Sequence, residues 1–89
     1  MIDRLKGAAR TFVLTRPIFV ELAHDDGVVR ASHVGLGVFG TGSTAPEALA
    51  DFAIFFEAQW DGLVNVDEHD LSDGARALRG EFLALVGHT

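Results

Sequence analysis

The 89-residue sequence contains no cysteine and no long uninterrupted run of apolar residues. Without cysteine, the chain can form neither a disulfide framework nor a thiolate metal site. No apolar stretch approaches the roughly 20 residues that cross a bilayer, and the charged first ten residues lack the apolar segment of a secretory signal. These absences predict a cytoplasmic protein that does not contact a membrane.

Basic residues are scarce in the second half of the chain. Residues 45–89 contain two Arg and nine Asp or Glu, whereas residues 1–44 contain five Lys or Arg and four Asp or Glu, and the net charge is −6. Because an acidic protein repels phosphate backbones, we do not expect a nucleic-acid partner. A small basic protein would be attracted instead, although the same acids could also serve solubility alone.

The length fits a single domain, residues 1–89, because two cores would leave each half too small to be stable. Apolar residues make up 48% of the sequence, which is typical of a folded chain rather than a disordered one. Residues 1–10 are ambiguous: their apolar residues fit one or two helical turns, but Gly7 disfavours a helix.

Three strands are predicted in the first half. Apolar residues alternate with polar ones over residues 12–22, and Pro17 indicates an edge position or a break within this strand. Asp25-Asp26-Gly27 is a turn sequence, so residues 28–34 predict the returning strand of a hairpin. Residues 36–41 predict a third strand, whose glycines indicate a bulge or a close backbone approach.

Two helices are predicted in the second half. Thr44 and Glu47 form a capping box at the start of a helix that ends near Gly62. After a polar, acidic linker, a second helix is capped by Asp70 or Ser72 and ends at residue 87. The order predicts an α+β fold, in which a three-stranded antiparallel sheet carries helices packed on one face (β-β-β-α-α).

The motifs that could carry chemistry are weak. Residues 35–40 spell G-x-G-x-x-G, but the helix begins four residues after the last glycine, too late for a dinucleotide fingerprint. The four histidines include no i, i+4 pair for zinc, and no nucleophile-elbow pattern occurs. We therefore expect no enzyme activity, no cofactor and no metal. The alternative is a metal-dependent enzyme that uses the oxygen-rich linker, with these residues: Asp61, Asp67, Glu68, His69 and Asp70.

The first helix carries apolar residues on both flanks of its buried stripe. With Leu49 at the centre of the stripe and 100° per residue, Phe55 lies about 120° to one side and Ile54 about 140° to the other. One small domain cannot easily bury both, so at least one is expected at an interface, unless the second helix or the N-terminal segment covers it. We predict Ile54, Phe55 and Gln59 as the partner or oligomer interface.

Residues 18–44 and the pair Glu47-Ala48 also match a family pattern. Residues 18–22, the turn at 25–27 and residues 29–32 resemble the opening hairpin of HicB-like antitoxins. Residues 36–44 (LGVFGTGST) resemble that family's third strand and its Gly-x-Thr entry to a helix, and Glu47-Ala48 matches its Glu-Ala pair. The resemblance covers about residues 18–63. It implies a partial RNase H-like fold and an oligomeric antitoxin.

The resemblance also implies a partner, which would be a small ribonuclease toxin. The leading hypothesis is a non-catalytic protein-binding module that neutralises such a toxin by covering its active surface. A structural homo-oligomer without a toxin partner is the second hypothesis, and the metal-dependent enzyme is the third.

Overall fold

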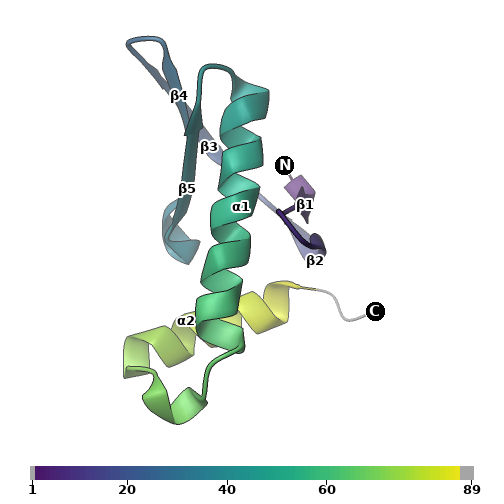
Figure 1. Cartoon of the computed structure of the whole chain (residues 1–89), viewed down its shortest axis with the longest axis vertical. Helices are drawn as coiled ribbons and strands as arrows, with labels where there is room; N and C mark the ends of the chain where they lie inside the picture. Colours follow the sequence, from purple (N-terminus) through teal and green to yellow (C-terminus); the bar gives the residue numbers. More distant parts are fainter. Residues whose placement is uncertain (1, 87–89) are drawn as a thin grey trace.

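The computed structural model describes residues 2–86. Five strands precede two α-helices (Figure 1). The elements are β1 (Ile2–Lys6), β2 (Thr11–Ile18), β3 (Glu21–Asp25), β4 (Val28–His33), β5 (Val38–Gly42), α1 (Ala45–Val64) and α2 (Asp73–Leu85), with short 3₁₀ helices at Val34–Leu36 and Glu68–Asp70. Neither α-helix combines the length and the apolar character that a membrane crossing requires.

The strands form two antiparallel sheets. β1 pairs with β2, and the second sheet has the order β3-β4-β5. The predicted α+β class, with a three-stranded antiparallel sheet and two helices, is confirmed. The predicted order β-β-β-α-α is incomplete, because the ambiguous N-terminal residues form the strand β1 instead of helical turns.

The predicted strand over residues 12–22 is two strands. β2 ends at Ile18 and β3 begins at Glu21, so the break lies at residues 19–20 and begins two residues after Pro17. Pro17 has no N–H to give to a ladder, and at this point the chain exchanges its pairing partner, from β1 to β4. The break that Pro17 indicated is therefore present, and it separates the two sheets.

The β3–β4 hairpin has the predicted turn. Asp26 and Gly27 both have positive φ angles, 48° and 78°, which is the pattern of a type I′ turn whose twist matches that of the flanking strands. The third predicted strand begins later than expected. Residues 34–36 form a 3₁₀ helix, whose Leu36 N–H donates to His33 Nδ1 over 3.1 Å.

Helix α1 lies against β5 at very short range. Thr44 caps the helix through Glu47 N–H (3.3 Å), and the Glu47 carboxylate accepts the Ser43 N–H (2.8 Å). A Cβ atom added to Gly40 would overlap the backbone nitrogen of Phe52, and one added to Gly42 would meet the backbone of the helix's first turn. The predicted close backbone approach is confirmed, and it brings α1 over β4 and β5.

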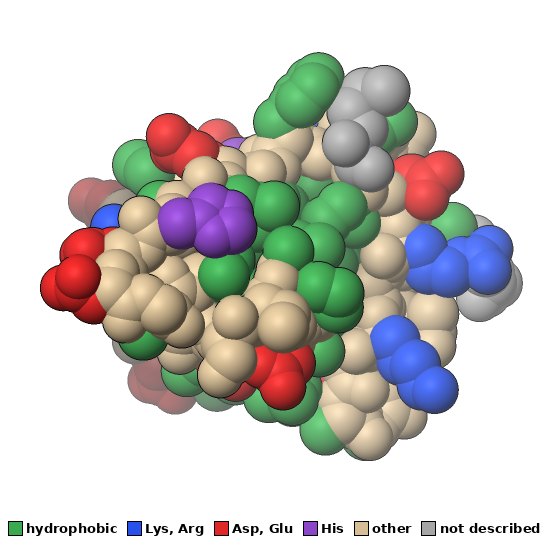
Figure 2. Space-filling view, turned by 90° about the horizontal axis from the view of Figure 1, so that it is seen from above, with side chains coloured by type: hydrophobic (Ala, Val, Ile, Leu, Met, Phe, Trp, Pro, Cys, Tyr) green, Lys and Arg blue, Asp and Glu red, His purple; other side chains and the backbone are tan. Residues whose placement is uncertain are grey.

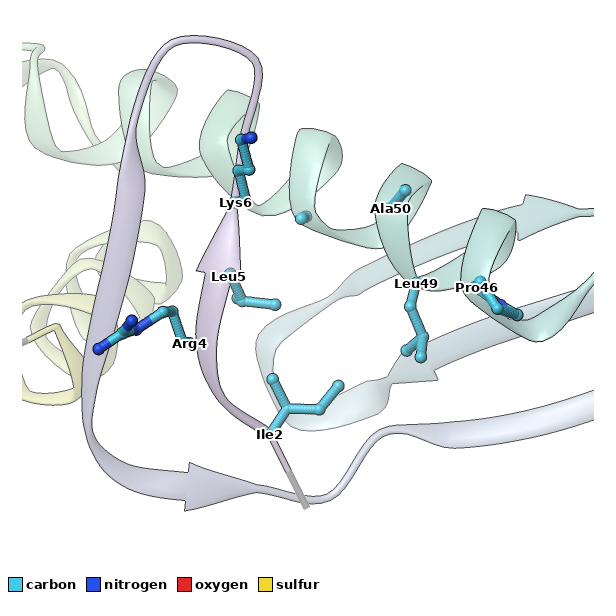
Figure 3. A pocket seen from close by; sticks show the side chains of 8 residues that line it. Ile2, Arg4, Leu5, Lys6, Pro46, Leu49 and Ala50 are labelled. Carbon is cyan, nitrogen blue, oxygen red and sulfur yellow. The ribbon is translucent and has the colours of Figure 1, made fainter.

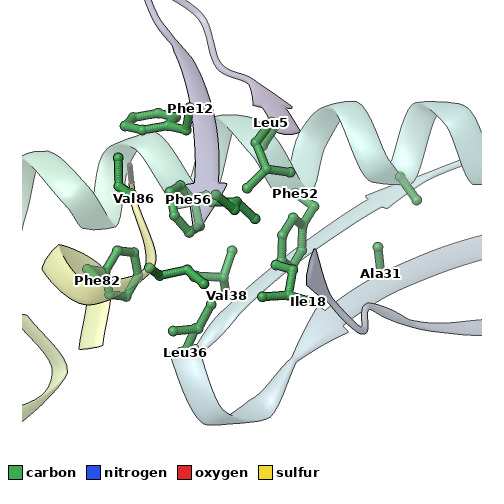
Figure 4. Close-up of a cluster of buried hydrophobic side chains, with 14 of the residues drawn as sticks. Leu5, Phe12, Ile18, Ala31, Leu36, Val38, Phe52, Phe56, Phe82 and Val86 are labelled. Atoms are coloured by element: carbon green, nitrogen blue, oxygen red, sulfur yellow. The ribbon is translucent and has the colours of Figure 1, made fainter. Parts of the chain in front are cut away.

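Phe56 lies at the centre of the core and joins three parts of the chain (Figure 4). Its ring centroid is 5.1 Å from that of Phe12 on β2 and 4.9 Å from that of Phe82 on α2. Ser72 caps α2 by accepting the Ala75 N–H. The apolar stripe of α2 is buried or partly buried and consists of Ala75, Leu78, Phe82, Leu85 and Val86. The predicted end of this helix at residue 87 lies outside the described residues.

The two helices do not share one face of the three-stranded sheet as predicted. α1 covers β4 and β5, whereas α2 packs mainly against α1, β2 and the 3₁₀ helix at Val34–Leu36. Figure 1 shows α2 crossing beneath the C-terminal end of α1. The additional β1–β2 hairpin is the reason, because it supplies a second apolar surface that α2 can cover.

The α1–β5 contact predicts the effect of a single methyl group. We expect Gly40→Ala to lower the free energy of unfolding by about 2 kcal/mol or more, because α1 must move away from β5. The matched control is Gly80→Ala on α2, where a Cβ atom meets nothing within 4 Å. That variant should gain about 0.5–1 kcal/mol from helix propensity. Urea unfolding followed by circular dichroism measures both, and equal stabilities would contradict the contact.

Candidate functional site

The predicted interface residues lie on two different surfaces of α1. Ile54 is 48% exposed and Phe55 is 47% exposed, so neither α2 nor the N-terminal hairpin covers either side chain. Successive helical residues point 100° apart, which directs the two side chains to different surroundings. Gln59, one turn after Phe55, is half-buried near Gly37.

Ile54 lies on the side of α1 that faces away from the sheet. Its helical neighbours at i±4 and i±7 are all exposed and are small or acidic. We call this surface the α1 outer face, and it consists of Glu47, Ala50, Ile54, Ala58 and Asp61. An apolar side chain is thus flanked by carboxylates at both ends. Figure 2 shows acidic side chains at several places around the view, whereas the basic ones lie mainly at one edge.

Phe55 lies on the flank of α1 beside β5. Its ring stacks on that of Phe39, with centroids 6.0 Å apart and an angle of 30° between the ring planes. Phe39 is itself 58% exposed. We call this second surface the β5 edge surface, and it consists of Phe39, Phe55 and Gln59. The structure therefore brings Phe55 and Gln59 together and places Ile54 apart from them.

Glu57 is a charged residue of α1 that is only 6% exposed. Its carboxylate accepts the N–H groups of Ala8 (2.9 Å) and Ala9 (3.2 Å) in the β1–β2 loop, and it pairs with Arg10. Arg10 also forms an ion pair with Asp61, and hydrogen bonding to Asp61 is the largest cause that raises the pKa of Arg10. These bonds hold the N-terminal hairpin against α1.

A groove of about 390 Å³ separates β1 from the N-terminal half of α1 (Figure 3). Ile2, Leu5 and Leu49 point into it, whereas Arg4 points away from it. Its other lining residues are Lys6, Pro46, Ala50 and Ala53. Among residues 2–86, no carboxylate, hydroxyl or imidazole lines this groove, so the described lining has the chemistry of an apolar contact surface.

The acidic linker does not assemble into a cation site in residues 2–86. No group of three or more His, Asp or Glu side chains that could hold an ion occurs there. Asp61 is turned toward Arg10 and Asn65, while Asp67 accepts the His69 N–H at the start of the second 3₁₀ helix. The metal-dependent alternative therefore gains no support from the geometry of these residues.

Two residues of these surfaces were missed in the sequence. Phe39 was expected in a strand but was given no role, although alternation after a buried Val38 places it outward. Glu57 falls 40° from Ala53 on the helical wheel, at the border of the buried stripe. A carboxylate at that position indicates a buried partner, because a charge is rarely buried alone.

Comparison with known proteins found no match of any kind: no family model, no curated protein and no solved structure is similar to this chain at a significant level. The likeness to HicB-like antitoxins therefore stays a resemblance in the motifs of residues 18–63.

The Glu57 contacts predict a specific loss of stability. We expect Glu57→Gln to lower the free energy of unfolding by about 1–3 kcal/mol, because an uncharged amide cannot neutralise Arg10 and its NH₂ group would replace the oxygen that accepts from Arg10 Nε. Glu81→Gln, at an exposed position of α2, serves as the control and should change it by less than about 0.5 kcal/mol. Thermal unfolding of both variants tests this. Equal losses would show that Glu57 does not hold the hairpin.

Proposed function

We propose that this protein is a non-catalytic, antitoxin-like binding module whose α1 outer face receives a small basic protein. The observation that carries the proposal is the exposed Ile54 between the carboxylates of Glu47 and Asp61. An apolar centre within a charged rim is the usual anatomy of a protein–protein contact.

Electrostatics favours a basic partner. Nine acidic and two basic residues in the second half of the chain give this half a strongly negative field. Such a field steers a cationic protein toward the helices and raises the rate of encounter. The apolar Ile54 would then add affinity once the partner is seated, because its exposed area leaves water.

The resemblance to HicB-like antitoxins supports a particular partner, a small ribonuclease toxin. The succession of β3, β4, β5 and α1 agrees with the β-β-β-α order of the partial RNase H-like fold that the resemblance implies, and we propose that fold for residues 18–63. A ribonuclease offers a basic surface to RNA. Carboxylates on α1 would occupy that surface in place of phosphates and exclude RNA, in the cytoplasm where the toxin acts.

The other two hypotheses have their own tests. A thermal shift on adding calcium, magnesium or manganese would favour the metal-dependent enzyme, and no shift would exclude it. A homo-oligomer with nothing attached after capture from the native cell, and no toxin-sized reading frame beside the gene, would favour the structural homo-oligomer.

The proposal predicts the behaviour of the captured partner. We expect affinity capture from the native cell to yield a small basic protein in stoichiometric amount. Once separated, this protein should cleave RNA by itself, and adding the pure 89-residue chain should stop the cleavage. Ile54→Asp should raise the concentration needed for inhibition about 10-fold or more, because it places a buried charge in the contact.

The matched control is Val28→Asp, since Val28 is also β-branched and also 48% exposed but lies on β4. Val28→Asp should inhibit as the parent chain does. An acidic partner, a partner without RNA cleavage, or equal effects of the two substitutions would each contradict the proposal.

A further inference from the structure

β5 is an edge strand with main-chain groups that face outward. In the order β3-β4-β5 only one side of β5 is paired. The Thr41 N–H donates to Asp51 on α1 over 2.9 Å, so it points away from β4. In an antiparallel ladder, alternate residues direct their N–H and C=O groups to the same side. The N–H and C=O of Phe39 therefore also face outward, and no bond to them occurs within residues 2–86.

The edge is only partly protected against pairing, because α1 reaches it through Asp51 at Thr41 and through the Phe55 ring beside Phe39. Natural edge strands are blunted by lysine, proline, bulges or a covering element. β5 has the sequence Val-Phe-Gly-Thr-Gly, which offers none of these side chains, and its pairing with β4 has no bulge. Asp51 protects Thr41 alone. Beside Phe39 the exposed surface is the aromatic pair Phe39–Phe55, whose rings meet around the edge because Val38 and Gly40 face α1.

The charge along this edge points to a second copy of the chain as the occupant. Residues 31–46 contain no Asp, Glu, Lys or Arg, although the whole chain has a net charge of −6. Two acidic copies repel each other over most of their surfaces, and this stretch is where they can meet without that repulsion. A basic partner would gain nothing from an uncharged edge.

We propose that the β5 edge surface joins two copies of this protein across a two-fold axis near Phe39. Two identical edges related by such an axis run antiparallel, and each Phe39–Phe55 pair packs on the same pair of its mate. The nearest acids, Glu47 and Asp51, lie toward the Gly42 end of the strand, where their carboxylates bind Ser43 and Thr41. They therefore face the uncharged residues 35–37 of the mate rather than its carboxylates.

The dimer is independent of the proposed function. Ile54 points about 100° away from Phe55 around the α1 axis, so the α1 outer face stays open in both copies. A dimer of this kind would present two such faces.

Sedimentation equilibrium of the 89-residue chain over a range of concentrations tests the dimer. We expect a species of twice the chain mass of 9.5 kDa. Phe55→Asp and Phe39→Ser should each weaken the dimer about 100-fold or more, because each removes two central aromatic contacts at once. Phe19→Ser is the matched control, since Phe19 is 76% exposed but lies between β2 and β3, and it should leave the dimer intact.

Circular dichroism of each variant checks that the fold survives, and Phe39→Ser keeps the test valid where Phe55→Asp unfolds. Salt gives an independent readout: added salt should strengthen this dimer by screening the repulsion between the two copies, whereas it should weaken binding of a basic protein at the α1 outer face. A parent chain that stays monomeric at the highest concentration, a dimer that survives both substitutions, or one that Phe19→Ser disrupts equally would overturn the proposal.

Discussion

The contact between α1 and β5 determines where every candidate binding residue lies. Gly40 and Gly42 present no side chain to the helix, so the helix backbone lies directly on the strand. At this separation Asp51 reaches the Thr41 N–H, and the Phe55 ring reaches Phe39. A side chain on either glycine would push the helix outward and separate these pairs. The β5 edge surface therefore depends on the absence of a side chain at both glycines.

The N-terminal hairpin completes the core on the opposite flank of α1. Phe12 packs on Phe56 and Trp60, and Glu57 bonds the loop that joins β1 to β2. A buried carboxylate is costly unless hydrogen bonds and an opposite charge compensate for its lost hydration, and here two backbone N–H groups and Arg10 do so. Because this flank is occupied, the exposed apolar residues of α1 remain on its outer face and beside β5.

These two exposed surfaces differ in charge, so each suits a different kind of partner. The α1 outer face has carboxylates around Ile54, which suits a basic protein. The β5 edge surface belongs to a stretch without charged side chains, which suits an identical acidic copy. Self-association and partner binding can therefore occur together, because the two surfaces face different directions on one helix.

The local structure of this protein follows from its sequence alone. Capping at Thr44, the turn at Asp26-Gly27, the break at Pro17 and the stripes of both helices follow from short-range sterics and periodicity, which neighbouring residues settle among themselves. Packing between distant segments is what makes residues 2–6 a strand, buries Glu57 and brings Phe39 against Phe55. Each of these depends on segments distant in sequence, and no local pattern states which distant segment will pack against which.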